Sequence, residues 1–210
     1  MSTAAAAAVV AATALFTGMA AAAPPSTATP NSPGATNSPT ADGNGAGPHR
    51  PLLSLTGLSA RRVTTADLVA AAKWGTGSPI DDPAREQQVL DSAAERARRL
   101  GGDPETTRRI FRDQIEANKV VQRGLYRRWR DDPSASPTER PELSEVRTEV
   151  NRVDEALVRA VVASARWRSA PLCDVALAVS TVHVRRARHL DRLHSAALDL
   201  SVGSVCGSVV

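Results

Sequence analysis

The sequence is poor in aromatic residues and in cysteine. Its 210 residues include three Trp, one Tyr, two Phe and two Cys. Proteins that bind single-stranded nucleic acid stack the bases on exposed aromatic rings along a basic groove. The scarcity of rings argues against nucleic-acid binding, despite a formal net charge of +4. Two cysteines without a matching histidine spacing make a poor metal site, so we expect no metal.

The signatures of several enzyme classes are missing as well. The sequence contains no G-x-S-x-G, no phosphate-binding P-loop, no H-E-x-x-H and no dinucleotide fingerprint. His183, His189 and His194 lie near the C-terminus among arginines, and we interpret them as surface or packing residues. The sequence therefore does not predict chemistry that depends on an activated nucleophile.

The first 50 residues lack the composition of a packed domain. Residues 1–23 are almost wholly small and apolar, and an apolar centre at 11–19 is followed by four alanines, which is typical of a signal peptide. No Lys or Arg precedes this centre, which is atypical for such a signal. Residues 24–50 are Pro, Ser, Thr, Asn, Gly and Ala with few aliphatic side chains, which predicts a disordered linker. We expect a secreted protein whose mature form has no membrane segment.

Residues 51–210 are long enough for one domain with its own core. They are rich in Ala, Leu, Val, Arg and Glu and contain no alternating strand pattern of useful length. This composition is typical of a helical bundle. The sequence therefore predicts an all-α, single-domain bundle of five to six helices.

Capping residues and prolines place most of the expected helices. Asp82-Pro83 and Asp103-Pro104 each combine an N-cap residue with a proline at the first helical position. The expected helices span residues 51–75, 83–100, 104–130, 144–167 with Ser144 as cap, and 172–202. Gly57 and the Val63–Thr65 run predict a weak centre in the first helix. The β-branched run Val179–Val182 predicts a kink or a division in the last helical region.

Two polar residues interrupt an apolar stripe of the third helix. Asn118 and Gln122 lie one turn apart between Ile115 and Leu125, where burial of an amide costs a few kcal/mol unless it finds a partner. One interpretation is a polar pair bonded to other core groups. The other is that this face lines a water-filled cavity.

Several cations also lie beside apolar helix faces. Arg62 and Lys73 are eleven residues, about three turns, apart and point nearly the same way. Arg85 lies one turn before the apolar residues of the second helix and therefore next to its apolar face. This position also fits an ordinary ion pair in the first turn. Arg147 is expected in a first turn, where the helix dipole disfavours a cation. Its side chain either bends into solvent or faces a bound anion.

Five segments of the chain stand out together because of their order and spacing. They are Ala71-Ala72-Lys73-Trp74, Pro79-Ile80-Asp81-Asp82-Pro83-Ala84-Arg85-Glu86, Asp113-Gln114-Ile115-Glu116-Ala117-Asn118-Lys119, Leu143-Ser144-Glu145-Val146-Arg147 and Arg186-Ala187-Arg188-His189-Leu190-Asp191. Together they resemble the exported all-α chorismate mutases of bacteria, particularly the actinobacterial kind. The resemblance covers roughly residues 58–206.

The resemblance implies a role for each of the polar residues described above. Arg62, Arg147 and Arg85 correspond to arginines of the substrate pocket, of which the first two bind carboxylates. Lys73 corresponds to a lysine that contacts a carboxylate and the ether oxygen, and Gln122 to the second donor to that oxygen.

Three further positions of the implied pocket bind other parts of the substrate. Asp82 and Glu86 correspond to positions that hold the substrate hydroxyl, and Asn118 to a small polar pocket position. Cys173 and Cys206 correspond to a pair that forms an intramolecular disulfide.

The implied activity is the intramolecular rearrangement of chorismate to prephenate, a reaction that needs no nucleophile, acid, base or cofactor. Relatives of this kind form homodimers with each active site inside one chain. The alternative is an exported, non-catalytic helical bundle that binds anions or another protein. Such a bundle would keep the arginines but would not need the amides of Asn118 and Gln122.

Overall fold

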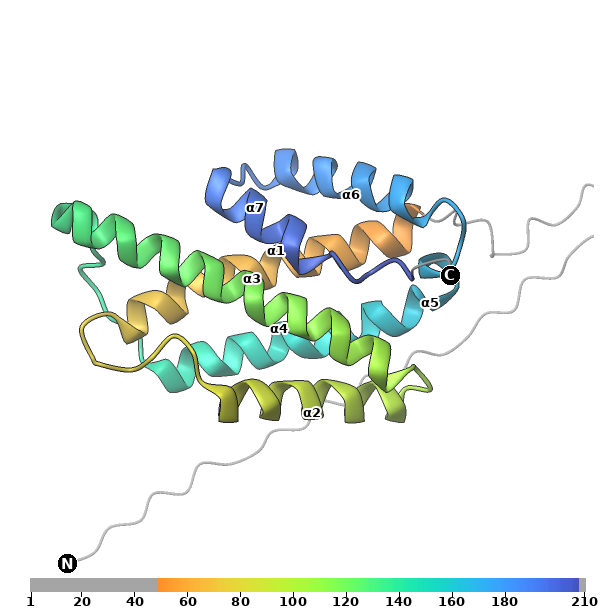
Figure 1. The fold of residues 1–210 in the computed structure, drawn as a ribbon, viewed down its shortest axis with the longest axis horizontal. Coiled ribbons are helices and arrows are strands. Elements are labelled where there is room, and N and C mark those ends of the chain that lie inside the picture. Colours follow the sequence, from red (N-terminus) through yellow and green to blue (C-terminus); the bar gives the residue numbers. More distant parts are fainter. Residues whose placement is uncertain (1–48, 208–210) are drawn as a thin grey trace, which may run out of the picture. The chain divides into compact units, whose positions relative to one another are not determined.

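The computed structural model describes residues 49–207, which form helices joined by short loops (Figure 1). The predicted signal peptide and nearly all of the predicted linker lie outside these residues. The described helices are α1 (His49–Lys73), α2 (Pro83–Arg99), α3 (Pro104–Asp131), the 3-10 turn η1 (Pro133–Ala135), α4 (Leu143–Ala163), α5 (Ala165–Arg168), α6 (Cys173–Ala187) and α7 (Arg192–Ser201). The all-α prediction is confirmed. The described chain has seven α-helices rather than five to six, because α5 is a separate turn and the last region is divided.

Two of the predicted helix starts are confirmed in detail. Asp82 accepts a hydrogen bond from the backbone N–H of Arg85 at 3.0 Å, and Pro83 is the first residue of α2. Asp103 accepts from the N–H groups of the residues that follow Pro104. In both places the aspartate satisfies donors that have no partner inside the helix.

The predicted cap of the fourth helix is wrong. Glu142, not Ser144, occupies the N-cap position of α4, and its side chain makes no capping bond. The backbone carbonyl of Glu142 instead accepts from Glu145 and Val146, so the first turn closes before Ser144 can cap it. Arg147 therefore lies beyond the first turn of α4.

The last helical region divides later than predicted. The run Val179–Val182 lies inside α6, because the hydroxyl groups of Ser180 and Thr181 bond to carbonyls four residues earlier and are compatible with a regular helix. The break falls at 188–191 instead, where His189 has a φ of 49°. This reversal returns α7 along α6 and brings Cys206 to Cys173, with a Cα–Cα distance of 5.8 Å. The predicted disulfide is confirmed.

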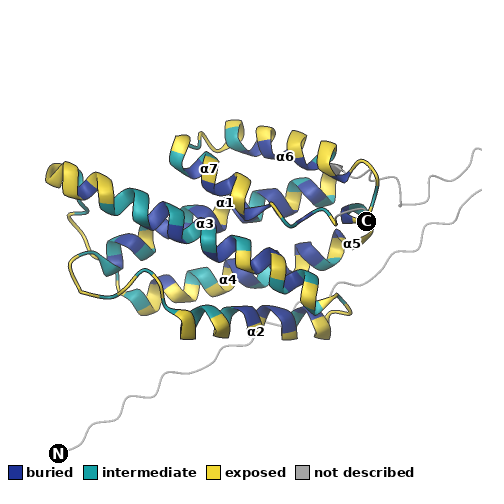
Figure 2. Cartoon of the chain, in the orientation of Figure 1, coloured by how far each residue is buried: buried dark blue, intermediate teal, exposed yellow. Residues whose placement is uncertain are grey.

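The first helix is not interrupted at its centre. α1 continues through Gly57 and Thr65, and it contacts α3, α4, α6 and α7. Packing on several sides outweighs the low helix propensity of its central residues. Figure 2 shows the buried faces of the helices turned toward one another. Leu52, Leu55 and Phe111 are fully buried.

Candidate active site

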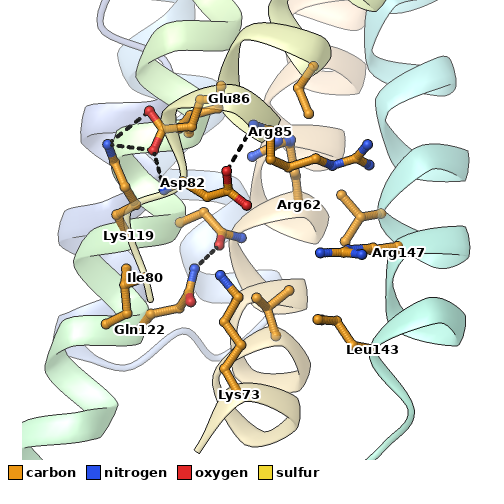
Figure 3. A pocket seen from close by; sticks show the side chains of 15 residues that line it. Arg62, Lys73, Ile80, Asp82, Arg85, Glu86, Lys119, Gln122, Leu143 and Arg147 are labelled. Atoms are coloured by element: carbon orange, nitrogen blue, oxygen red, sulfur yellow. Dashed lines mark hydrogen bonds and ion pairs between the residues drawn. The ribbon is translucent and has the colours of Figure 1, made fainter. Parts of the chain in front are cut away.

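All eight predicted site residues line one pocket, which lies between α1, α2, α3 and the start of α4 (Figure 3). Apolar side chains complete its walls. The predicted residues are Arg62 and Lys73 from α1, Asp82, Arg85 and Glu86 from the start of α2, Asn118 and Gln122 from α3, and Arg147 from α4.

Arg62 is held rigidly at the inner side of the pocket. Its Nε donates to Asp154 Oδ1 at 2.6 Å and its Nη1 to the carbonyl of Gln114 at 2.8 Å. Arg62 is only 4% exposed. A guanidinium has five N–H donors, so donors remain for a ligand after both bonds are made. Asp154 thus fixes the direction in which the cation points.

Lys73 reaches into the pocket from the last turn of α1 (Figure 3). Its Nζ donates to the carbonyl of Pro79 at 2.8 Å, in the loop that turns back at Gly75 and Gly77, both with positive φ. Burial lowers the pKa of Lys73, the Asp82 carboxylate opposes this, and Arg147 lowers the pKa again. An anionic ligand placed here would relieve the repulsion between the two cations.

The amides of Asn118 and Gln122 are bonded to each other rather than to other core groups. Gln122 Nε2 donates to Asn118 Oδ1 at 2.7 Å. The second N–H of the Gln122 amide takes no part in that bond. The buried amide oxygen of Gln122 has no hydrogen-bond partner among residues 49–207. Because both residues also line the pocket, the pair is part of a cavity wall rather than of a closed core.

Arg85 and Arg147 carry charges that no carboxylate neutralises among the described residues. The two Nη atoms of Arg85 donate to the amide oxygens of Gln88 at 3.2 Å and of Asn151 at 3.4 Å. Arg147 is exposed and forms no ion pair within the described part of the chain. Both guanidinium groups can therefore turn toward an anion without first breaking an ion pair.

One lining residue, Lys119, was not predicted as part of the site. It is 8% exposed, and its Nζ lies 3.2 Å from both carboxylate oxygens of Glu86. The sequence offered a weak signal, since Lys119 lies next to Asn118 and three residues after Glu116. A lysine on a helix flank is usually solvated, so nothing in the sequence alone marked this one as buried.

The charges and residue types of the lining indicate which kind of ligand the pocket fits. Five of them are cationic and two, Asp82 and Glu86, are acidic, which leaves a formal charge of +3 on the wall. The lining contains no Ser, Cys or His. Such a wall fits a small anion with more than one acidic group, which it could orient and to which it could donate hydrogen bonds.

Comparison with known proteins identifies the family. A family model described as chorismate mutase type II matches residues 54–123. The chain is 35% identical over 156 residues to the secreted chorismate mutase of Mycolicibacterium smegmatis, covering 74% of this chain and 86% of that protein. It is 33% identical over 155 residues to the secreted chorismate mutase of Mycobacterium tuberculosis, covering 74% and 78%. The chain belongs to the chorismate mutase family.

Solved structures agree with this assignment. The chorismate mutase of Burkholderia phymatum has a TM-score of 0.71 and 36% identity, over 76% of this chain and 98% of that chain. The chorismate mutase of Burkholderia thailandensis has the same TM-score and 33% identity, over 74% and 99%. The predicted family, fold and enzyme class, an isomerase, are confirmed.

Proposed function

We propose that this pocket is where the protein rearranges chorismate to prephenate, and that its eight predicted residues bind and activate the substrate. One observation carries the proposal. Residues from four separate segments, each predicted to lie in the site, line a single cationic pocket. The reaction moves electrons within one molecule, so it requires no nucleophile from the protein.

The arginines are proposed to select the reactive shape of the substrate. Chorismate carries two carboxylates, and Arg62, Arg85 and Arg147 supply cations from three helices around one space. Holding both carboxylates favours the compact, chair-like conformer in which the reacting carbon atoms are close. The fixed direction of Arg62 lowers the entropic cost of this selection.

Lys73 and Gln122 are proposed to act on the breaking bond. Negative charge grows on the ether oxygen as its carbon–oxygen bond lengthens. The ammonium of Lys73 and the unused N–H of Gln122 would donate to that oxygen more strongly in the transition state than in the ground state. Asp82 and Glu86 are proposed to hold the ring hydroxyl, and Asn118 to hold the amide of Gln122.

The first prediction is that Lys73→Ala abolishes turnover while the fold survives. Loss of one donor to a developing oxyanion costs about 3–4 kcal/mol, or roughly a factor of 10²–10³ in kcat. The assay is the loss of chorismate absorbance with purified protein that lacks residues 1–48, with melting followed by circular dichroism. Arg128→Ala, at an exposed position of α3, is the control and should retain normal turnover. Near-normal kcat in Lys73→Ala would reject the assignment.

A pH profile tests the role of Gln122. A neutral amide donates at any pH, whereas a glutamate at this position must be protonated to donate. We expect kcat/KM of the wild type to show no steep fall between about pH 5 and pH 7.5, and that of Gln122→Glu to fall as the pH rises. A steep fall in the wild type would contradict the proposed role.

The location and partners follow from the family and the sequence together. The expected secretion agrees with the names of both mycobacterial relatives, and no helix among the described residues is long and apolar enough to cross a membrane. We propose that the mature protein is a homodimer that binds chorismate, with no nucleic-acid or membrane partner. The alternative of a non-catalytic bundle is set aside, because the chain belongs to the chorismate mutase family.

A further inference from the structure

Lys119 connects three elements that meet at the pocket. Its Nζ lies 2.6 Å from Glu116 Oε1 on α3, 3.2 Å from Glu86 Oε2 on α2 and 3.4 Å from Asp81 Oδ1 in the loop before α2. The lysine head is almost covered, with its side chain 10% exposed. Burial lowers the pKa of Lys119, but the hydrogen bonds and charges of Glu116 and Glu86 outweigh it and raise the pKa overall. The lysine is therefore charged at neutral pH.

Glu86 depends on Lys119 for its position. Its other hydrogen bond, accepted from the backbone N–H of Asp82, is long at 3.4 Å. Both carboxylate oxygens of Glu86 lie within 3.2 Å of the lysine Nζ, and Figure 3 shows the Glu86 carboxylate turned toward Lys119. Without the ammonium, the carboxylate would be free to turn into solvent, because its side chain is 27% exposed.

We propose that Lys119 is a positioning residue that acts on the substrate through Glu86, by holding this carboxylate where it accepts a hydrogen bond from the ring hydroxyl of chorismate. The inference rests on the proposed function of the pocket. Asp81 extends the arrangement, since it also pairs with Arg123 at 2.6 Å and so ties the loop before α2 to α3. Lys119 contributes to the position of Glu86 and to that of the loop, whereas Arg123 contributes to the position of the loop alone.

The test uses Lys119→Met, which keeps most of the length of the side chain and removes the charge. A charge-assisted hydrogen bond contributes about 1.5–3 kcal/mol, so we expect kcat/KM for chorismate to fall about 10- to 100-fold. With an analogue of chorismate that lacks the ring hydroxyl, Lys119→Met and wild type should differ by less than about threefold. In the Glu86→Gln background, Lys119→Met should cause little further loss.

Two variants guard against a merely structural effect. Arg123→Gln loosens the loop without touching Glu86 and should keep most of the activity. Lys119→Arg restores a cation and should recover part of the loss. If Lys119→Met does not fold, Lys119→Gln replaces it in the same comparison, and Glu86→Gln must still lose its defect on the analogue.

The possible results separate the two levels of the argument. A wild type that does not turn over chorismate refutes the proposed function. A wild type that is active, with Lys119→Met unimpaired or equally impaired on chorismate and on the analogue, overturns the role of Lys119 and leaves the proposed function intact.

Discussion

Asp154→Asn removes the carboxylate that orients Arg62, and its effect can be calculated from the structure. The Arg62 Nε–Asp154 Oδ1 distance is 2.6 Å, and the two side chains are 5% and 12% exposed. Removing one partner of a buried ion pair costs about 3–5 kcal/mol, because the other charge stays buried without compensation. Asparagine keeps an oxygen that can accept from Nε, so we expect a loss near the lower end, about 3 kcal/mol.

Thermal unfolding followed by circular dichroism measures this loss. For a domain of this size each kcal/mol lowers the melting temperature by about 2–4 °C, so Asp154→Asn should melt about 6–12 °C below the wild type. The control is Glu149→Gln, which breaks two neighbouring pairs, Arg61–Glu149 and Arg152–Glu149, with the arginines 48% and 70% exposed and the glutamate 27% exposed. Each of these exposed pairs should contribute less than about 1 kcal/mol.

The same site separates stability from catalysis. In the double variant Arg62→Met/Asp154→Leu two apolar side chains replace the buried pair, a change that is often neutral or stabilising. We therefore expect a melting temperature near that of the wild type, together with a loss of chorismate turnover. The reasoning is refuted if Asp154→Asn melts with the wild type, or if the double variant remains fully active.

Two further predictions concern the C-terminal helices. The Nε2 atom of His194 lies 2.9 Å from Asp67, and its Nδ1 atom lies 2.8 Å from Asp191. The hydrogen bond to Asp67 raises the pKa of His194 from 6.5 to about 9; burial opposes this rise and Asp191 adds to it. The stabilisation by charged His194 is therefore fully present below about pH 6.5 and is lost as the pH rises through about 9. The difference in melting temperature between the wild type and His194→Gln should shrink over that interval. A difference that stays constant would contradict this. The disulfide Cys173–Cys206 joins residues 33 positions apart, and its reduction should lower the free energy of unfolding by about 3–4 kcal/mol. Denaturant unfolding with and without reductant measures this loss as a shift of the midpoint. Equal midpoints would show that the disulfide adds no stability.

The parts of the site that could be predicted from the sequence are those where local chemistry and family resemblance agree. Asp82 precedes a proline, so its capping role follows from two residues alone. Asn118 and Gln122 interrupt an apolar stripe at helical spacing, and this marks them without any knowledge of their neighbours. The break between α6 and α7 does not fall at Val179–Val182, because Ser180 and Thr181 are buried and their hydroxyl groups bond to carbonyls within α6. Residue propensity alone does not include these contacts.

The remaining features depend on contacts between residues far apart in the sequence. Asp154 lies 92 residues from Arg62, and Glu86 lies 33 residues from Lys119; no spacing rule connects either pair. Yet both contacts obey one physical requirement, since a buried cation needs a carboxylate nearby. A cationic pocket that must receive a dianion cannot neutralise all its charges itself. The two inner cations, Arg62 and Lys119, are paired with acids, and Arg85 and Arg147 stay available for the proposed ligand.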